Sequence, residues 1–434
     1  MQNTNTALPR DYDVVGLLAD LAGTCSKSVI NVGEPAPRLT ALVRMIAALL
    51  MVLALLGWGA RVEATVPQEC SLSADTNPQP NEGPTDELLY LPSKGTLNAV
   101  MIFVDFPDAP QSETTRSLYN LLVPDARRWY REVSYGQLKL RVTRSRSWYR
   151  MPKSSIEYGF ADGVTFEEHR AYIADAIAVS DLNVDYSQYD LAYIVSSQGA
   201  ELPISPTFTA FPGSGVLVDG SEVRHAVTFG SDIRVPRPNY GAHVLVHETG
   251  HLLGLPDLYE FGAEDLFDAL RFGGGWDVMS WVAPGAHFLL WHKLKLGWLK
   301  DDQITCVSSG QITETITPVE VARGLKGIVV RISPTRAYVI EVRQLIGQDR
   351  RLCDQGALIY TVDAATPNGS GPVIVQPAQT GTDSAQVEQC GPLYDAPFDI
   401  GLGEVSLFSD TAVGMTVELV SRNRKTYVVR VTKE

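Results

Sequence analysis

Several kinds of residue and motif are scarce in this sequence of 434 residues. It has only 7 histidines, and 36 Lys and Arg stand against 50 Asp and Glu, which gives a formal net charge of −14 at pH 7. Such a deficit of basic residues argues against nonspecific binding to nucleic acids, whose phosphates attract basic surfaces. The sequence also lacks a phosphate-binding loop, a dinucleotide fingerprint, zinc-finger spacing, heptads and any repeat of solenoid length. Functions that depend on those motifs are therefore disfavoured.

Long uncharged hydrophobic runs are rare, and the prominent one lies near the amino terminus. It spans Met45–Ala60, follows the basic residues Arg38 and Arg44, and precedes a small-residue cleavage signal that ends at Ala64. This arrangement is typical of a secretory signal peptide. Because the run is shorter than the about 20 residues of a membrane span, we expect cleavage after Ala64 and a secreted, extracellular product without stable membrane association. In the alternative, an uncleaved run tethers the protein, with residues 1–44 in the cytoplasm.

Cysteine is scarce as well, with 5 residues in the whole sequence. Signal cleavage would remove Cys25 and leave Cys70, Cys306, Cys353 and Cys390. An even number of cysteines in a secreted chain favours disulfides, and four cysteines can pair in three ways. We expect Cys353 to pair with Cys390, since both lie in the carboxy-terminal region, and Cys70 with Cys306. In an alternative, a free Cys70 ligates a metal as a thiolate and holds the protein latent.

The segment from His247 to His251, with the sequence His-Glu-Thr-Gly-His, is the most informative motif. Residues four apart lie on the same face of a helix, so the imidazoles of His247 and His251 can bind one cation with Glu248 beside it. We expect this helix to cover residues 240–253. The pattern predicts a zinc (Zn2+) site in which Glu248 accepts a proton from water and returns it to a leaving group.

The residues after this helix complete the expected ligand set. Gly254 is expected to end the helix, because glycine readily adopts the left-handed conformation that turns the chain. Asp257 follows in a position to act as the third zinc ligand, although its Leu-Pro-Asp-Leu context is also that of an ordinary turn. His243 lies near the same helix face and is expected to support the site or pack beside it, with His243 and Glu260 as the alternative third ligands.

Two imidazoles and one carboxylate leave a coordination position open for water, which is typical of catalytic rather than structural zinc. Tyr240 and Tyr259 are candidates for a further donor to the developing oxyanion, and neither is favoured over the other. His287 and His292, farther along the sequence, are expected to be structural.

A glycine-rich loop follows the motif at Gly273–Ser280. Its three consecutive glycines permit a tight turn, and Met279 is a flexible, polarizable side chain suited to packing beneath a metal site. We interpret Met279 as a supporting residue, and Trp276 and Asp277 as structural. A helix with two histidines followed by such a methionine resembles the Met-turn arrangement of metzincin proteases.

Together these segments resemble the immune inhibitor A family of secreted zinc metalloproteases over roughly residues 96–365. The resemblance implies a zinc endopeptidase that acts on protein or peptide substrates, with zinc ligands at His247, His251 and Asp257 and the base at Glu248. The supporting segments are HETGHLLGLPDLY at 247–259, GWDVMS at 275–280, VMIFVDFPD at 100–108, WYREVSYG at 129–136 with the run 138–142, and YVIEVR at 338–343.

The order of the expected elements indicates a mixed α/β or α+β fold. It predicts a metzincin-like catalytic domain followed by a smaller antiparallel β domain. We divide the chain into a lead-in and signal peptide (1–64), a linker or short pro-segment (65–95), a zinc metalloprotease catalytic domain (96–300) and a carboxy-terminal β-rich domain (301–434). Helices are expected at 114–133, 166–179, 240–253 and 287–296, and strands at 99–104, 138–143, 191–195, 312–316, 327–332, 338–342, 357–362, 415–420 and 426–431.

Two points stay open at this level. The chain could be a zinc-containing binding or adhesion protein with weak or lost catalysis, although the presence of Glu248 argues against this because a structural site needs no base. Calcium (Ca2+) is also open, since Asp105, Asp108 and residues 395–399 offer oxygen ligands without calcium-loop spacing. The sequence does not indicate an oligomeric state.

Overall fold

The computed structural model describes residues 69–73, 80–381 and 383–434, all of them within one compact unit. The expected signal peptide, and with it the alternative of a membrane tether through residues 45–60, lies outside the described residues. Within the described part of the chain, none of the helices has the length and apolar character needed to cross a bilayer.

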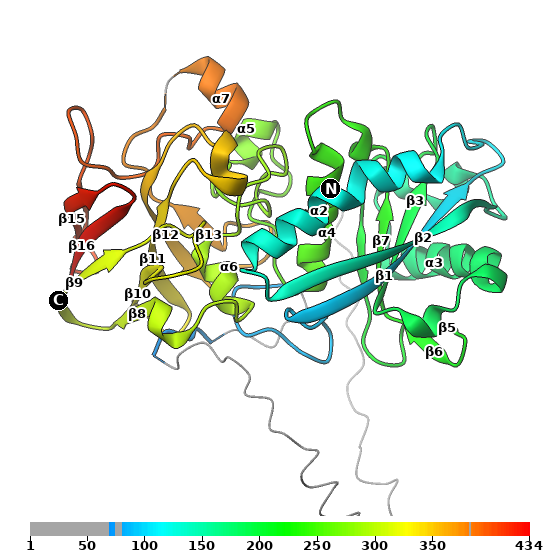
Figure 1. The fold of residues 1–434 in the computed structure, drawn as a ribbon, viewed down its shortest axis with the longest axis horizontal. Coiled ribbons are helices and arrows are strands. Elements are labelled where there is room, and N and C mark those ends of the chain that lie inside the picture. The colour runs from blue at the N-terminus through cyan, green and yellow to red at the C-terminus, as the bar shows by residue number, and fades with distance from the viewer. Residues whose placement is uncertain (1–68, 74–79, 382) are drawn as a thin grey trace, which may run out of the picture. The chain divides into compact units, whose positions relative to one another are not determined.

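A five-stranded sheet carries the first half of the fold (Figure 1). In spatial order its strands are β2 (Leu138–Arg150), β1 (Gly95–Asp105), β3 (Leu191–Ser196), β7 (His225–Phe229) and β4 (Thr207–Thr209). The first four strands run parallel, whereas β4 pairs antiparallel with β7 and ends the sheet. The strands β1, β2 and β3 contain the predicted ones, but β4 and β7 were not predicted. A small hairpin is formed by β5 (Val216–Val218) and β6 (Ser221–Val223).

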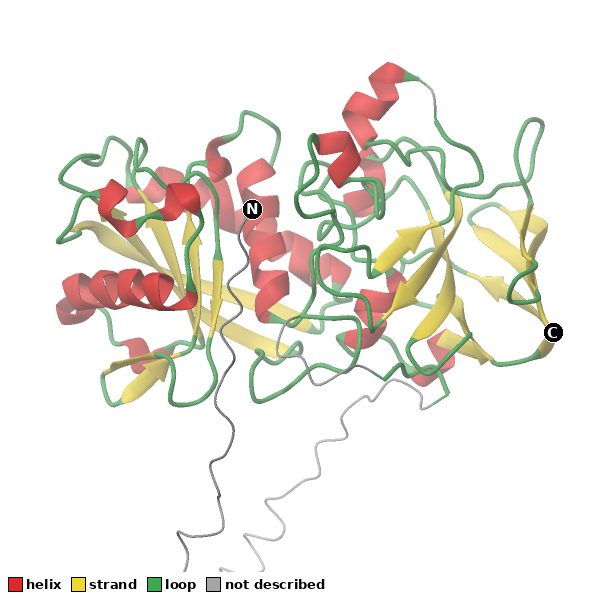
Figure 2. Ribbon diagram, turned by 180° about the vertical axis from the view of Figure 1, so that it is seen from behind, coloured by secondary structure: helices red, strands yellow, loops and turns green. Residues whose placement is uncertain are grey.

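Helices cover both faces of this sheet, as Figure 2 shows from behind. The helices α2 (Thr115–Val133) and α4 (Tyr240–Leu252) share one hydrophobic core with Met101 and Phe103 of β1. The helix α3 (Phe166–Ser180) packs on the opposite face, against Ile102 and Val104. Adjacent β1 residues point to opposite faces because side chains alternate along a strand. All three helices lie within one residue of their predicted limits.

The helix predicted over residues 287–296 is shorter than expected, and α6 covers only Leu290–Lys295. Buried carboxylates bind the backbone N–H groups that would otherwise begin the helix. Asp349 Oδ1 accepts from the N–H of His287 at 2.7 Å, and Asp277 Oδ2 accepts from the N–H of Leu289 at 2.7 Å. These partners come from elsewhere in the chain, so local sequence could not place this boundary. A short unpredicted helix, α5, covers Leu266–Ala269.

Two further sheets form the carboxy-terminal region. The first, in the order β13-β12-β11-β10-β8, is antiparallel except for the parallel pair β8–β10, which corrects the expectation of an entirely antiparallel region. The second, in the order β14-β15-β16-β9, is antiparallel throughout. The strands are β8 (Ile304–Val307), β9 (Gly310–Ile316), β10 (Gly327–Arg331), β11 (Arg336–Arg343), β12 (Gly356–Asp363), β13 (Val373–Val375), β14 (Leu407–Asp410), β15 (Met415–Asn423) and β16 (Thr426–Lys433).

Short helices complete the fold. The helix α7 covers Ser384–Cys390. The single-turn 3-10 helices are η1 (Ser155–Tyr158), η2 (Phe160–Asp162), η3 (Asp181–Asn183), η4 (Tyr186–Gln188), η5 (Asp232–Arg234), η6 (Asp301–Gln303) and η7 (Gly347–Arg351). The core beneath α4 includes Val339 and Tyr360 of the carboxy-terminal sheet, so both halves of the chain contribute to it. The domain boundary at residue 300 stays a prediction.

Two disulfides join the pairs that the sequence predicted. Cys70 is bonded to Cys306, with 5.4 Å between their Cα atoms, and Cys353 is bonded to Cys390, with 6.0 Å between theirs. The alternative of Cys70 as a metal-ligating thiolate is therefore wrong, because its sulfur is already bonded. Disulfides of this kind are typical of proteins from oxidising compartments.

The segment before the first sheet is packed into the core wherever it is described. Glu82, only 1% exposed, lies 3.0 Å from Nε2 of the buried His292, whose Nδ1 lies 2.9 Å from Asp277 Oδ2. The backbone N–H of Leu91 donates to the carbonyl of Leu252, at the end of α4. Residues 80–91 therefore contact both α6 and the end of α4, although their polar composition had suggested a linker or pro-segment.

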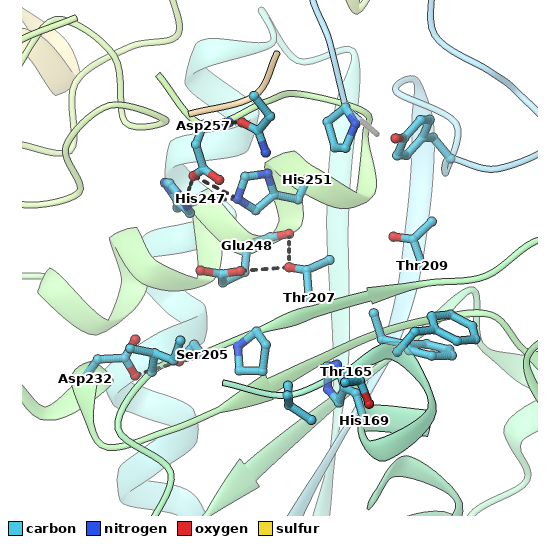
Figure 3. A pocket seen from close by; sticks show the side chains of 18 of the residues that line it. Thr165, His169, Ser205, Thr207, Thr209, Asp232, His247, Glu248, His251 and Asp257 are labelled. Carbon is cyan, nitrogen blue, oxygen red and sulfur yellow. Dashed lines mark hydrogen bonds and ion pairs between the residues drawn. The ribbon is translucent and has the colours of Figure 1, made fainter. Parts of the chain in front are cut away.

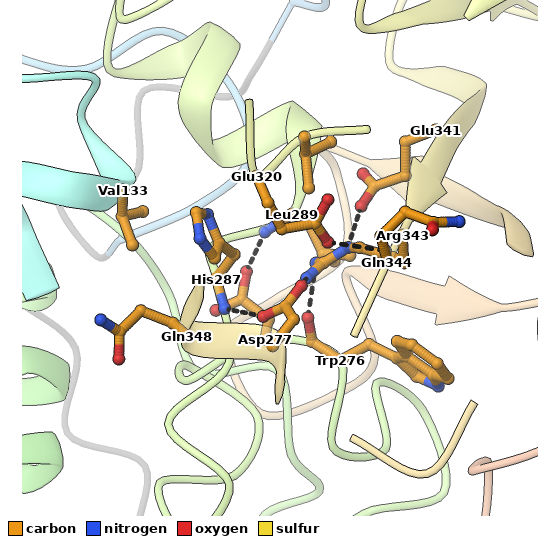
Figure 4. Close-up of polar contacts among 12 residues, drawn as sticks. Val133, Trp276, Asp277, His287, Leu289, Glu320, Glu341, Arg343, Gln344 and Gln348 are labelled. Atoms are coloured by element: carbon orange, nitrogen blue, oxygen red, sulfur yellow. Dashed lines mark hydrogen bonds and ion pairs between the residues drawn. The ribbon is translucent and has the colours of Figure 1, made fainter. Parts of the chain in front are cut away.

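A buried arginine links the carboxy-terminal sheet to the glycine-rich loop. Arg343 on β11 donates to Glu341, to Asp349 and to the backbone carbonyl of Trp276, the last at 2.6 Å (Figure 4). Burial lowers the pKa of this guanidinium, but the adjacent carboxylates of Asp349 and Glu341 outweigh burial and hold the pKa above its usual range. The charged contacts thereby fix the loop that carries Met279.

Candidate metal centre

Three predicted ligands converge at the end of α4. Successive turns of the helix bring the Nε2 atoms of His247 and His251 to 3.1 Å from each other. Asp257 Oδ1 lies 3.0 Å from Nε2 of His247 and 3.2 Å from Nε2 of His251. No other group of three His, Cys, Asp or Glu side chains in the described residues is placed to hold a metal ion.

The triangle of these three atoms has the dimensions of one face of a zinc tetrahedron. Zinc bonds of about 2.0 Å in tetrahedral geometry place neighbouring ligand atoms about 3.3 Å apart, close to the 3.0 to 3.2 Å observed here. Asp257 Oδ1 is buried, and its polar neighbours are the Nε2 atoms of the two histidines. A buried carboxylate oxygen is costly unless a cation or a protonated group binds it. The three residues therefore fit a zinc ion.

Backbone carbonyls fix the orientation of both imidazoles. Nδ1 of His247 lies 2.9 Å from the carbonyl oxygen of Val278, and Nδ1 of His251 lies 2.8 Å from that of Leu255. A carbonyl oxygen can only accept, so each Nδ1 carries the proton and donates it. In the neutral rings this leaves both Nε2 atoms unprotonated, with their lone pairs directed at the shared position.

The imidazoles and the carboxylates at this site shift the pKa values of one another. Burial lowers the pKa of His251, but the Asp257 and Glu248 carboxylates outweigh burial and raise the pKa to about 9. Burial conversely raises the pKa of Asp257, and the two imidazoles outweigh it and hold the pKa well below its usual range. The carboxylate thus stays ionised, which is the form that ligates a metal.

Glu248 is held by a threonine from the edge of the sheet. Thr207, the first residue of β4, donates its hydroxyl at 2.8 Å to Glu248 Oε2, and the same hydroxyl lies 3.1 Å from the Glu248 carbonyl oxygen (Figure 3). Burial raises the pKa of Glu248, and the two imidazoles and this hydrogen bond partly oppose the rise. Thr207 was not predicted from the sequence, since nothing local marks a three-residue strand as part of the site.

The glycine-rich loop lies directly under α4. A Cβ atom at Gly250 would be 2.6 Å from the sulfur of Met279, so the absence of a side chain lets the methionine reach the helix. Gly254 has a φ of 86°, a left-handed conformation that turns the chain after the helix and brings Asp257 back toward the histidines. Steric constraints thus explain why glycine stands at both positions of the motif.

The other candidates differ in how close they lie to the three ligands. Nδ1 of His243 lies 2.9 Å from the carbonyl oxygen of Val282, and Glu260 pairs with Arg271. Tyr259 lines the cavity beside the ligands, with its ring centroid 6.3 Å from that of His247. Tyr240, at the first turn of α4, is absent from the residues that line this cavity. Of the two tyrosines, Tyr259 is therefore the better placed to donate a hydrogen bond to a developing oxyanion.

Three of the carboxylates considered as calcium ligands are bound by other protein groups. Asp105 pairs with Arg150, and Asp108 accepts from the hydroxyl of Ser155 at 2.7 Å. Asp399 pairs with Arg422, and Asp395 belongs to no three-residue ligand group among the described residues. Asp105, Asp108 and Asp399 therefore each have a protein partner, and calcium binding stays an open question.

A cavity of about 630 Å³ opens over the ligands and Glu248. It extends past Thr207 on β4 and is bordered on another side by Leu89 and Tyr90 of the amino-terminal segment. It is large enough to admit a short stretch of polypeptide. No family model matches this sequence, and no curated protein matches it either. The chemistry of the site is accordingly inferred from its own residues.

Proposed function

We propose that this protein is a secreted zinc endopeptidase. The observation that carries the proposal is the convergence of His247, His251 and Asp257 at 3.0 to 3.2 Å, with Glu248 on the adjacent position of the same helix. A purely structural zinc site would need no buried carboxylate beside its ligands. The resemblance of the sequence motifs to the immune inhibitor A family supports the same activity and adds a metzincin-like character to the catalytic region.

Each residue of the site has a separate role in the proposed hydrolysis of the peptide bond. Zinc, when bound, acidifies water and polarises the substrate carbonyl. Glu248 accepts the proton of the attacking water and then delivers it to the leaving amine. Thr207 holds the carboxylate of Glu248 in place through its hydroxyl. Tyr259, at the wall of the cavity, is in a position to donate a hydrogen bond to the developing oxyanion.

The position of β4 supports a protein or peptide as the substrate. Pro206 O accepts from Thr228 of β7, and the N–H of Ala210 donates to Arg224, directly before β7. With the alternation of an antiparallel ladder, the backbone groups of Thr207 and Thr209 therefore point to the open edge of the sheet. An extended peptide can add to such an edge through main-chain hydrogen bonds. Its backbone would then pass directly beside Glu248.

Secretion rests on two independent features. Both disulfides favour an oxidising compartment, and the run at residues 45–60 has the composition of a signal peptide. Amino-terminal sequencing of the secreted protein tests this part of the proposal. A start at Thr65 supports cleavage, whereas a cell-bound product that keeps residues 1–64 supports the tether.

The experiment that tests the activity combines metal analysis with a chelation assay. We expect the purified protein to contain one zinc per chain, to cleave unfolded casein, to stop when zinc is removed by 1,10-phenanthroline, and to recover when zinc is restored. Stoichiometric zinc without cleavage of any unfolded protein would favour the alternative of a catalytically weak binding or adhesion protein. Cleavage that survives complete removal of zinc would contradict the proposal.

A further inference from the structure

The cavity above the metal ligands continues across the edge strand onto an apolar surface. Val164, Phe166, Ile204 and Phe208 line its far side, and we call these four residues the apolar shelf. Figure 3 shows Thr165 and His169 on that side of Thr207, away from Glu248 and the ligands. The catalytic carboxylate and the shelf therefore border one continuous space.

The shelf is preformed and open to solvent. The rings of Phe166 and Phe208 stack with centroids 5.0 Å apart and an interplanar angle of 20°. Phe208 is buried and packs edge-on against His169, whereas Phe166 is 43% exposed and Ile204 is 58% exposed. Exposed large apolar side chains that gather in a concave site, rather than singly over a surface, are typical of binding sites.

The polar groups around the shelf are already bonded to other protein groups. Nε2 of His169 lies 3.0 Å from the Thr228 hydroxyl, and burial lowers the pKa of His169 to about 4, so this imidazole is neutral near pH 7. The carboxylate of Glu168 accepts from the Thr165 hydroxyl, and that of Asp232 accepts from Ser205. A charged or strongly polar side chain placed on the shelf would therefore lose hydration without gaining a partner.

The pleat of β4 relates the shelf to the catalytic site. Thr207 points toward α4, where it contacts Glu248, and the next residue, Phe208, points toward α3, where it joins the opposite core. A peptide paired with this edge has the same alternation of side chains. Its residues would face the catalytic site and the shelf in turn.

We propose that the apolar shelf selects bulky apolar side chains at alternate positions of the bound peptide. This inference rests on the proposed function, because it assumes that the peptide lies along β4. The inference narrows the expected substrates to segments in which Phe, Leu or Ile recurs at every second residue around the cleavage point. Sequences that form β-strands in folded proteins have this pattern and are accessible when those proteins are unfolded.

Binding and cleavage are measured separately to test the inference. A fluorescent peptide with alternating Phe and Thr is compared with a peptide that has Ser in place of Phe. Affinities are measured by anisotropy on the purified chain that carries Glu248→Gln, with and without zinc, and kcat/KM is measured on the otherwise unaltered protein. The shelf variants are Phe166→Ala and Ile204→Ser. The control is Leu182→Ala, which removes an apolar side chain that is 99% exposed and does not line the cavity.

We expect the unaltered shelf to bind the Phe peptide more tightly than the Ser peptide, and Phe166→Ala to weaken binding of the Phe peptide about tenfold, the scale of losing apolar contacts in a pocket. Binding of the Ser peptide and the behaviour of Leu182→Ala should not change. Moving each Phe by one position should keep the affinity and move the cleavage point by one residue, because the peptide can slide along the edge until the rings face the shelf again. Equal affinity for both peptides, or equal loss in both, would overturn the shelf while leaving hydrolysis intact. Selective binding without cleavage would overturn the hydrolysis and leave the shelf.

Discussion

Thr207 and Glu248, 41 residues apart in the sequence, are joined by a hydrogen bond of 2.8 Å that links the open edge of the sheet to helix α4. The threonine hydroxyl donates to one carboxylate oxygen and is close to the backbone carbonyl of the same glutamate. A carboxylate held in this way is restricted in rotation before substrate arrives. In the proposed mechanism, the edge strand contributes both a surface for a peptide backbone and an orienting contact for the base.

Removal of this contact should slow hydrolysis without loss of zinc. In Thr207→Val the shape of the side chain is kept but the donor is lost, so Glu248 samples more orientations. We expect kcat/KM for casein peptides to fall about tenfold, since small misplacement of a catalytic group has effects of this order or larger. Thr207→Ser restores the hydroxyl and should retain most of the activity. A Thr207→Val enzyme with full activity would show that the contact does not position the base.

The third ligand can be tested against its alternatives. Outer contacts of a metal site change affinity about 10- to 100-fold when removed, so loss of a direct ligand in Asp257→Ala should lower zinc affinity by more than about 100-fold. Glu260→Ala is the matched control, because Glu260 pairs with Arg271 and not with the histidines. Competition with a chromogenic chelator measures both variants. Unchanged zinc affinity in Asp257→Ala would remove it from the ligand set.

Met279 and Gly250 should be energetically coupled. Alanine at 250 would place its Cβ 2.6 Å from the methionine sulfur, so overpacking of about 1–3 kcal/mol should outweigh the helix-propensity gain of about 1 kcal/mol. Met279→Ala alone should destabilise by about 2–5 kcal/mol, as large-to-small core changes do. In the double variant the added methyl group meets no sulfur, so urea unfolding should show a coupling near 1 kcal/mol. Strict additivity would contradict this packing.

Glu82 should stabilise the fold in a pH-dependent way. Burial lowers the pKa of His292, but the Glu82 and Asp277 carboxylates outweigh burial and raise it to about 10. Because the pKa of His292 is raised in the folded state, its pairing with these carboxylates contributes fully to stability below the unfolded-state pKa of 6.5. This contribution is lost as the pH rises through about 10. Burial lowers the pKa of Lys293 to about 7, and the effect of this shift on the pH dependence of stability is opposite to that of His292. The test therefore compares variants at the same pH and does not rely on a single curve of stability against pH.

We expect Glu82→Gln to lower the free energy of unfolding by about 3 kcal/mol at pH 6, the scale of breaking a buried ion pair. The loss should be clearly smaller at pH 10, where His292 is releasing its proton. Glu87→Gln, at an exposed position of the same segment, is the control and should have no measurable effect at either pH. A loss that is equal at both pH values would contradict the charged pairing.

The parts of the site that sequence could predict are those set by local geometry. The four-residue spacing of His247 and His251 places them on one helix face wherever the helix packs, and Gly254 limits where Asp257 can lie. Both disulfide pairs were likewise predicted, from the even number of cysteines and their distribution along the chain. These inferences need only a helix, a turn and covalent connectivity.

The parts that sequence could not predict depend on partners far along the chain. Thr207 belongs to a strand of three residues whose place at the sheet edge is set by pairing with β7. Glu82 lies in a stretch rich in proline and polar residues, yet its partner His292 is 210 positions away. The start of α6 is likewise set by Asp277 and Asp349, which bind the backbone ahead of it. Long-range hydrogen bonds of buried carboxylates leave no periodic signal.

The substitution Glu248→Gln tests the central claim most directly when zinc content and casein cleavage are measured on the same sample. Glutamine keeps the size of the side chain and an oxygen for Thr207, but it cannot accept the proton of water. We predict one zinc per chain and a rate reduced by about 10²- to 10⁴-fold, the usual contribution of a general base. A zinc-loaded Glu248→Gln protein that cleaves casein at the unaltered rate would contradict the account.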